Sequence, residues 1–276
     1  MRQYLLLSAA LILATAPAHA QHADHADHGS HAQHMAAESS LAAAIAAPHR
    51  SAANKARDAY RHPAETLAFF GVKSTDTVVE ISPGGGGWYT EILAPYLAKG
   101  GTLYLAQPEG RYLTSLKAKI AGDPATYGKV KWADFPITAT TVPDGSADVL
   151  LTFRNVHNWI MDKDPTLAER AFASFFRALK PGGVLGVVDH RLPEASDSAL
   201  EKSSGYTKRS TILALAEKAG FKLAAESEIN ANPKDKADGK VWRLPPTLGE
   251  GEANRDAYIA IGESDRMTLK FVKPAK

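Results

Sequence analysis

The chain has 276 residues, 45% hydrophobic and 22% charged, the balance of a globular protein that is long enough to bury a full core. Lys and Arg number 32 against 30 Asp and Glu, and no basic block stands out. The sequence therefore lacks the electrostatic pattern of a nucleic-acid-binding protein. It has no cysteine, which excludes disulfides, thiolate nucleophiles and cysteine-based zinc or iron–sulfur sites.

The first twenty residues have the pattern of a secretory signal peptide. Arg2 supplies a positive charge, residues 5–14 form an apolar run, and residues 18–20 (Ala-His-Ala) fit the small-x-small cleavage rule. The apolar run is shorter than the ~20 residues that span a bilayer, which argues against a membrane anchor. We therefore expect residues 1–20 to be removed, leaving a periplasmic or secreted protein that does not bind the membrane.

Residues 21–50 are interpreted as a disordered leader and linker whose first part is rich in histidine. Every third residue from position 22 to position 34 is a histidine: His22, His25, His28, His31 and His34. Neutral imidazole is the commonest metal ligand, so we expect this segment to bind Zn, Cu(II) or Ni(II). A polar spacer with incidental histidines is the alternative.

From residue 51 onward, helical and strand-like patterns alternate, which indicates a mainly parallel sheet covered by helices on both faces. Short apolar runs predict strands at 77–81, 102–106, 130–132, 148–153, 184–188, 221–229 and 267–272. Helical patterns occupy 51–61, 63–70, 88–97, 167–179 and 208–218. We interpret 51–276 as one domain and the polar stretch 230–262 as an insertion in it.

The turn after the first expected strand is rich in glycine. Glu80 lies at the end of the strand, and Ser82 and Pro83 precede four consecutive glycines, Gly84–Gly87. Such a loop lets the backbone approach a ligand, although a tight strand-to-helix turn needs glycine in any case. No Gly-Lys-Ser/Thr follows, and position 89 is tyrosine, so neither a P-loop nor a nicotinamide site fits.

The stretch VVEISPGGGGWYTEIL resembles motif I of class I S-adenosylmethionine-dependent methyltransferases. ADVLLTFRNVHNW and ALKPGGVLGVVDHR resemble the family's fourth-strand and fifth-strand motifs, and the resemblance covers about residues 60–273. The signal peptide, HPAETLAFFGV and ESDRMTLKFVKP resemble an exported branch known as predicted methyltransferases. The resemblance implies a Rossmann-like fold with a seven-stranded, mostly parallel sheet, its last strand antiparallel, and helices on both faces.

The resemblance also implies S-adenosylmethionine as the cofactor and assigns residues to its methionine part. In the family the motif I loop packs against that part, which corresponds here to Ser82, Gly84 and Gly86. Ser82 stands where the family pattern has its first glycine. The acid at the strand end, Glu80, orients the same region in the family.

Other residues correspond to the family's ribose and adenine contacts. The second strand usually ends in an acid that holds the ribose, but here it ends in Gln107, which lacks the charge-assisted hydrogen bond. Asp134 and Phe135 correspond to the adenine contact, and a turn residue is the alternative for Asp134. Asn155, after the fourth strand, is also assigned to the cofactor site.

The ends of the fourth and fifth strands carry the candidate catalytic residues. His157 is a candidate general base, and the adjacent pair Asp189-His190 suggests a tuned base or half of a metal site. A satisfied polar residue near the surface and a strand-end hydrogen-bond network are the alternatives. Few catalytic groups are required, because the methyl donor carries its own leaving group and the protein mainly positions the reactants.

These patterns predict an exported S-adenosylmethionine-dependent methyltransferase that acts on a small molecule. The alternative is a non-catalytic protein of the same fold that binds a metal or small ligand, with the histidine-rich leader as metal collector. Gln107 and Ser82 favour the alternative, whereas Gly84–Gly87 and Asp134-Phe135 favour the enzyme. A third interpretation, a metal-assisted hydrolase using Asp189 and His190, lacks both the Gly-x-Ser-x-Gly and the His-Glu-x-x-His motif.

Overall fold

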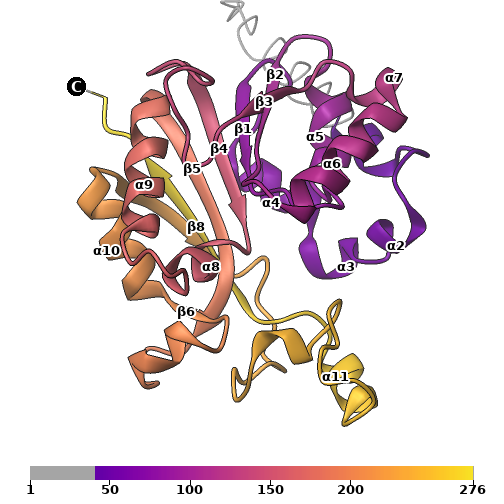
Figure 1. Ribbon diagram of the computed structural model, residues 1–276, viewed down its shortest axis with the longest axis vertical. Helices are drawn as coiled ribbons and strands as arrows, with labels where there is room; N and C mark the ends of the chain where they lie inside the picture. Colours follow the sequence, from indigo (N-terminus) through magenta and orange to yellow (C-terminus); the bar gives the residue numbers. More distant parts are fainter. Residues whose placement is uncertain (1–40, 276) are drawn as a thin grey trace, which may run out of the picture. The chain divides into compact units, whose positions relative to one another are not determined.

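A mostly parallel β-sheet organises residues 41–275, the part of the chain that the computed structural model describes (Figure 1). Its strand order is β3-β2-β1-β4-β5-β8-β7, and β6 pairs with β5. The bounds are β1 (Thr77–Ile81), β2 (Thr102–Ala106), β3 (Lys131–Ala133), β4 (Ala147–Phe153), β5 (Leu179–Leu192), β6 (Thr207–Lys208), β7 (Lys222–Ser227) and β8 (Arg266–Val272).

Pairing within the sheet confirms the predicted Rossmann-like fold. β1 lies at the centre and pairs in parallel with β2 and β4, while β8 runs antiparallel to both β5 and β7. The two-residue strand β6 is the one strand of the described residues that the sequence patterns did not predict.

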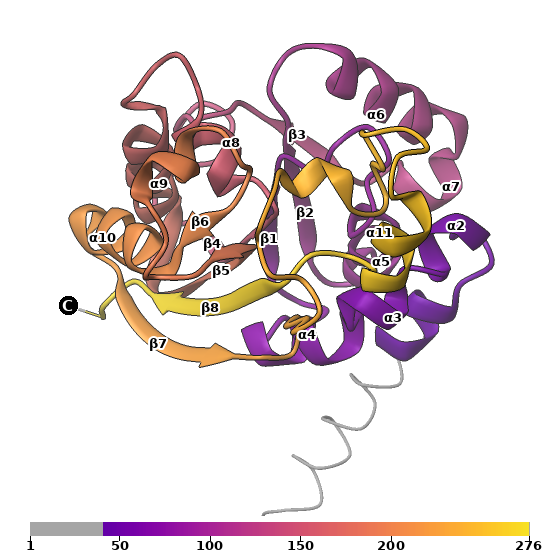
Figure 2. The same cartoon turned by 90° about the horizontal axis from the view of Figure 1, so that it is seen from below.

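Helices cover both faces of the sheet, with α9 and α10 on one side and α4 and α5 on the other (Figures 1 and 2). The bounds are α2 (Ala52–Lys55), α3 (Asp58–Arg61), α4 (Pro63–Phe70), α5 (Thr90–Leu97), α6 (Arg111–Gly122), α7 (Pro124–Tyr127), α8 (Val156–Ile160), α9 (Leu167–Ala178), α10 (Arg209–Ala219) and α11 (Arg255–Ile261). Pro63 opens α4 at its first position, where the missing N–H costs nothing, and Gly71 ends it with a φ of 77°.

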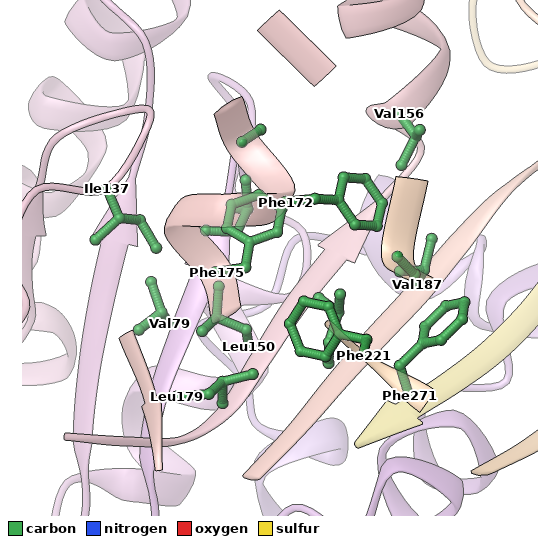
Figure 3. Close-up of a cluster of buried hydrophobic side chains, with 14 of the residues drawn as sticks. Val79, Ile137, Leu150, Val156, Phe172, Phe175, Leu179, Val187, Phe221 and Phe271 are labelled. Atoms are coloured by element: carbon green, nitrogen blue, oxygen red, sulfur yellow. The ribbon is translucent and has the colours of Figure 1, made fainter. Parts of the chain in front are cut away.

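Two hydrophobic clusters hold the layers together because alternate side chains of a strand point to opposite faces. In β1, Val79 belongs to the cluster that includes Phe172 and Phe175 of α9 (Figure 3). Its neighbour Val78 belongs to the other cluster, with Ile92 of α5. Both valines are fully buried, so β1 and the loop that follows it rest on a rigid support.

Several elements differ from the sequence prediction. The helix expected at 51–61 is divided into α2 and α3, and α6, α7, α8 and α11 had no predicted counterpart. In α6 only Leu113 and Leu116 are buried, so its apolar pattern is weak. The stretch 230–262 contains α11 and a 3-10 turn at Val241–Arg243 and is therefore not without structure.

The predicted signal peptide (residues 1–20) and the histidine-rich segment from His22 to His34 lie outside the described residues. Export and metal binding by the leader therefore stay predictions. Residues 41–46 are helical, and Leu41 and Ala44 are buried in the cluster that contains α5. Within residues 41–275, no helix has the length and apolar character that crossing a membrane requires.

Candidate functional site

The glycine loop after β1 lines a cavity of about 300 Å³. Ser82 has a φ of 48°, in the left-handed region that favours glycine, and it stands where the family motif has glycine. Its buried Oγ has no hydrogen-bond partner among the described residues. A Cβ placed at Gly84 or Gly86 would meet nothing within 4 Å. The loop therefore presents open space and an unsatisfied hydroxyl to a ligand.

Glu80 occupies the buried end of β1 and lines the same cavity. Its side chain is almost fully buried and accepts a hydrogen bond from Thr90 Oγ1 at 2.6 Å. Burial raises the pKa of Glu80 to about 7, against the opposing effects of the Thr90 hydrogen bond and the charge of Arg61. In the ligand-free chain this carboxyl group therefore titrates near neutral pH.

The free energy of unfolding of the chain should depend on pH through the titration of Glu80. The unfolded carboxyl group loses its proton near pH 4.5 and the folded one near pH 7, so the Glu80 contribution to stability falls as the pH rises through this window. Glu80→Gln should remove that part of the slope, as measured by chemical denaturation at several pH values. The same slope in both proteins would show that Glu80 does not titrate between these values.

The ends of β2 and β3 border a second cavity of about 270 Å³, lined by Gln107, Asp134, Phe135 and Trp132. The Gly84 N–H donates to Gln107 Oε1 at 2.8 Å, so the Gln107 side chain is tied to the glycine loop. Asp134 is exposed, and its Oδ2 accepts a hydrogen bond from Thr138 Oγ1. Asp134 therefore makes a contact typical of a turn residue, the alternative role given above. It also lines the cavity next to Phe135, where the resemblance places adenine.

The Gln107 geometry sharpens a test of the ribose assignment. In Gln107→Glu, one carboxylate oxygen can keep the bond from the Gly84 N–H, and the other can accept a charge-assisted bond from a ribose hydroxyl. We expect S-adenosylhomocysteine to bind about fivefold more tightly, the equivalent of roughly 1 kcal/mol. Calorimetric titration measures this change. Equal or weaker binding by Gln107→Glu would show that Gln107 does not contact the ribose.

His157 and Asp189 form a buried pair at the ends of β4 and β5. His157 Nδ1 lies 2.8 Å from Asp189 Oδ1, and the His157 backbone N–H donates to Asp189 Oδ2 at 2.9 Å. His157 lines a third cavity, of about 930 Å³. Its Nε2 makes no hydrogen bond to any described residue, so this nitrogen is the one available to a ligand.

His190 lies beside this pair and is held in a neutral state. Its Nε2 accepts a hydrogen bond from Arg154 Nε at 3.4 Å, and its Nδ1 contacts Ser264 Oγ. Burial, assisted by the charges of His157 and Arg154, lowers the pKa of His190 well below its usual value. The ring therefore stays uncharged at neutral pH and orients the Arg154 guanidinium.

The three predicted catalytic residues also have the composition of a metal site. One ligand atom each from His157, Asp189 and His190 lies within 4.8 Å of the others. Both Asp189 oxygens, however, already accept N–H groups of His157 and His190, and the Arg154 guanidinium faces His190 Nε2. A metal cation here would meet a fixed positive charge, so the arrangement suits an imidazole base better than a metal.

A cluster of arginines beside the glycine loop was not predicted from the sequence. Arg57, Arg61 and Arg154 line the 300 Å³ cavity. Glu263 pairs with Arg57 at 2.6 Å, with Arg266 at 3.0 Å and with Arg61 at 3.4 Å. Chiefly the charges of Arg61 and Arg266 lower its pKa to about 2, although burial opposes them. One carboxylate faces several guanidinium groups, so the cluster has capacity for another anion.

The short charged helix α3 does not present all of its charges to solvent. Arg61 is 6% exposed, and Asp58 pairs with Arg50 at 2.7 Å. The available signal was the i, i+4 spacing of Arg57 and Arg61, which places both on one side of a helical turn. The partner Glu263 lies some 200 residues later and leaves no local signal.

The cavity of the glycine loop and the cavity of His157 adjoin each other. Both are lined by Ser82, Gly84, Tyr112, Arg154 and Asn155. Asn155 bridges β4 to β1, because its Nδ2 donates to the Ile81 carbonyl at 2.9 Å. The structure thus brings most of the predicted site residues to one sheet edge: Glu80, Ser82, Gly84, Gly86, Gln107, Phe135, Asn155, His157 and His190. Asp189 forms a hydrogen bond with His157, which lines the 930 Å³ cavity.

Residues 79–187 match a family model described as a methyltransferase domain. This part of the chain is therefore similar to that family. A SAM-dependent methyltransferase from Aquifex aeolicus is similar in structure, with a TM-score of 0.52 and 13% identity over 86% of this chain and 98% of that one. Haemonchus contortus phosphoethanolamine N-methyltransferase 2, in complex with S-adenosyl-L-methionine, has a TM-score of 0.51 and 17% identity over 78% of this chain and 53% of that one.

At these identities the structural similarity establishes the fold of the chain alone. A comparison with curated proteins finds no match.

Proposed function

We propose that this chain transfers a methyl group from S-adenosylmethionine to a small molecule. The observation that carries the proposal is the adjacency of two cavities at the carboxyl ends of the parallel strands. One is framed by the glycine loop, and the other contains the free Nε2 of His157. Such strand ends are where open α/β sheets bind ligands, and residues of the stretch that matches the family model line both cavities.

The residues around the glycine loop fit the methionine part of the cofactor. Gly84 and Gly86 leave room for it, and Ser82 Oγ and Arg57 Nη2 are buried polar atoms without a partner in residues 41–275. Arg57 thus offers a charge-assisted bond to a carboxylate. When bound, S-adenosylmethionine supplies a methyl group on a positively charged sulfur, which needs no further activation to leave.

The remaining part of the cofactor fits the 270 Å³ cavity. Phe135 and Trp132 supply apolar faces for a planar base, and Asp134 supplies a carboxylate for an exocyclic amine. Gln107, between this cavity and the glycine loop, supplies an amide for the ribose. We assign these residues to the adenosine part, as the sequence resemblance implies.

His157 is proposed as the general base, with Asp189 as its positioning residue. The Asp189 carboxylate accepts the His157 Nδ1–H, which directs the lone pair of Nε2 into the 930 Å³ cavity. An acceptor that loses a proton during methylation can pass it to this nitrogen. His190, which contacts Arg154 rather than the free space beside His157, is assigned a positioning role.

Transfer of label from methyl-labelled S-adenosylmethionine into a small-molecule extract tests the proposed activity. Label that moves to small molecules only with the chain present supports the enzyme. Binding of S-adenosylhomocysteine without transfer from any extract supports the non-catalytic alternative, which Gln107 favours because it replaces the usual acid. Absence of both binding and transfer contradicts the proposed function.

Export and metal binding are proposals that rest on the sequence of the first 34 residues. The signal-like pattern at 1–20 supports a periplasmic or secreted location, and the five leader histidines support binding of Zn, Cu(II) or Ni(II). Metal titration with and without residues 21–34 tests the second proposal, because stoichiometry that survives the deletion would assign the ligands elsewhere.

A further inference from the structure

We propose that the methyl acceptor is a phenol, whose hydroxyl oxygen binds as an oxyanion at Arg154 beside the base His157 and whose ring lies against Trp242. This inference rests on the proposed function and specifies its substrate class. Three features of the 930 Å³ cavity carry it: an arginine with free donors, an imidazole with a free nitrogen, and aromatic walls.

Arg154 is held in an unusual conformation that directs its guanidinium toward the adjoining cavities. Its φ of 66° lies in the left-handed region, which is unfavourable for a non-glycine residue. The backbone N–H donates to Val188 O at 2.7 Å, and Nε donates to His190 Nε2. The two Nη groups form no hydrogen bond within residues 41–275, although the side chain lines both cavities. They are therefore available to an anionic oxygen.

The base and the arginine both lie next to His190. The rings of His157 and His190 have centroids 4.8 Å apart, and His190 in turn contacts Arg154. An oxygen placed between them could pass its proton to His157 Nε2 and leave its negative charge beside a guanidinium. Glu109, Asp162 and Asp164 also line this cavity, but an ammonium group placed beside His157 would meet the positive charge of Arg154. At that position the charge favours an acidic hydroxyl over an amine.

Several aromatic side chains contribute to the wall of this cavity, which favours a planar acceptor. Trp242 comes from the 230–262 stretch and has its ring centroid 6.4 Å from that of His157. Phe135 and Trp159 line the same cavity. Figure 2 shows the chain between β7 and α11 passing across the ends of the strands. Trp242 belongs to this segment and lines the cavity.

A buried polar network fixes the segment that carries Trp242. Tyr206 Oη donates to Asp235 at 2.8 Å, and Arg243, next to Trp242, donates to Tyr206 Oη at 3.2 Å. Tyr206 is fully buried against Val241. The indole therefore belongs to a preorganised wall, as a specificity-determining residue requires.

The step balances without a further reactant. The phenol O–H proton moves to His157 Nε2, and an electron pair of the oxygen forms the new bond to the methyl carbon. The electron pair of the broken carbon–sulfur bond stays on sulfur, and the imidazolium later releases its proton to solvent. No oxidant, reductant or metal takes part.

Binding of 4-nitrophenol in the presence of S-adenosylhomocysteine tests the inference, because the visible absorbance of this probe reports its ionisation. We expect the wild-type chain to bind the probe as phenolate and to lower its apparent pKa by about one unit, a tenfold shift in ionisation. Arg154→Gln should abolish that shift. The matched control Arg209→Gln, which removes an exposed arginine of α10, should retain it.

Two further variants test the roles of Trp242 and of the base His157 separately. Trp242→Ala should weaken 4-nitrophenol binding at least about tenfold and leave S-adenosylhomocysteine binding unchanged. His157→Asn should slow methylation of 4-methylphenol by about 10²-fold or more but slow methylation of the readily ionised 4-nitrophenol much less. His62→Asn is the matched control, since His62 lies outside this cavity at a φ of 42° that asparagine tolerates.

Failure of this inference is distinguishable from failure of the proposed function. If S-adenosylhomocysteine binds but 4-nitrophenol does not, or if the probe binds as the neutral phenol equally well in wild type and Arg154→Gln, the phenol assignment is overturned alone. An equal loss of rate for both phenols in His157→Asn would also overturn it. If S-adenosylhomocysteine itself does not bind, the proposed function fails first.

Discussion

Glu263→Gln should destabilise the chain by about 3–5 kcal/mol, the cost of removing one partner of a buried ion pair. The Glu263 side chain is 4% exposed and is the carboxylate shared by Arg57, Arg61 and Arg266. Glutamine keeps the shape but leaves these guanidinium groups in mutual repulsion. Chemical denaturation at neutral pH measures the loss.

The pH dependence identifies the cause of that loss. Because the folded-state pKa of Glu263 is lowered from 4.5 to about 2, its contribution is complete above pH 4.5 and is lost as the pH falls through about 2. The difference between wild type and Glu263→Gln should therefore be constant near neutrality and shrink in acid. Glu226→Gln, which breaks an exposed pair with Arg209, should change stability by less than about 1 kcal/mol. Equal losses in both variants would contradict the account of the cluster.

Gly86→Leu should abolish binding of S-adenosylhomocysteine while leaving the fold intact. A Cβ at Gly86 meets no atom within 4 Å, and Gly86 is not among the residues of positive φ, so the backbone accepts a side chain. That side chain would occupy the 300 Å³ cavity assigned to the cofactor. We expect affinity to fall at least about a hundredfold, roughly 3 kcal/mol.

A matched control separates obstruction from general damage. Gly122→Leu adds the same side chain at the exposed end of α6, where a Cβ also meets nothing within 4 Å. Both variants should melt like the wild type, and only Gly86→Leu should lose binding. Gly84→Val is a less clean test, because the φ of 73° at Gly84 strains any side chain there. Unchanged affinity in Gly86→Leu would move the cofactor site elsewhere.

The central strands and the glycine loop could be predicted because their signals are local. Thr77–Ile81 is a short β-branched apolar run followed at once by glycines and a helix, and the structure places it at the centre of the sheet. The positions of Gln107, Asn155 and His157 followed from the same logic. Each comes at or just after a strand's carboxyl end, and parallel strands bring these ends to one edge.

The arginine cluster could not be predicted, because its geometry depends on contacts between distant segments. Arg57 and Glu263 are 206 positions apart, and nothing near either residue indicates the other. Trp242 was missed for a similar reason. The sequence around Trp242 is polar and contains proline and glycine, so it gives no sign of a buried ring. Its neighbour Arg243 is held by Tyr206, which lies more than thirty positions earlier in the chain. Local pattern indicates which residues lie on an element but not which distant charge or ring they meet.

Calorimetric titration of the chain lacking residues 1–20 with S-adenosylmethionine and S-adenosylhomocysteine tests the central claim most directly. We expect the wild-type chain to bind one molecule of each ligand in a saturable way. This binding should be lost in Gly86→Leu and retained in Gly122→Leu. Absence of binding by the folded wild-type chain, or binding that survives Gly86→Leu, would contradict the claim that the adjoining cavities form an S-adenosylmethionine site.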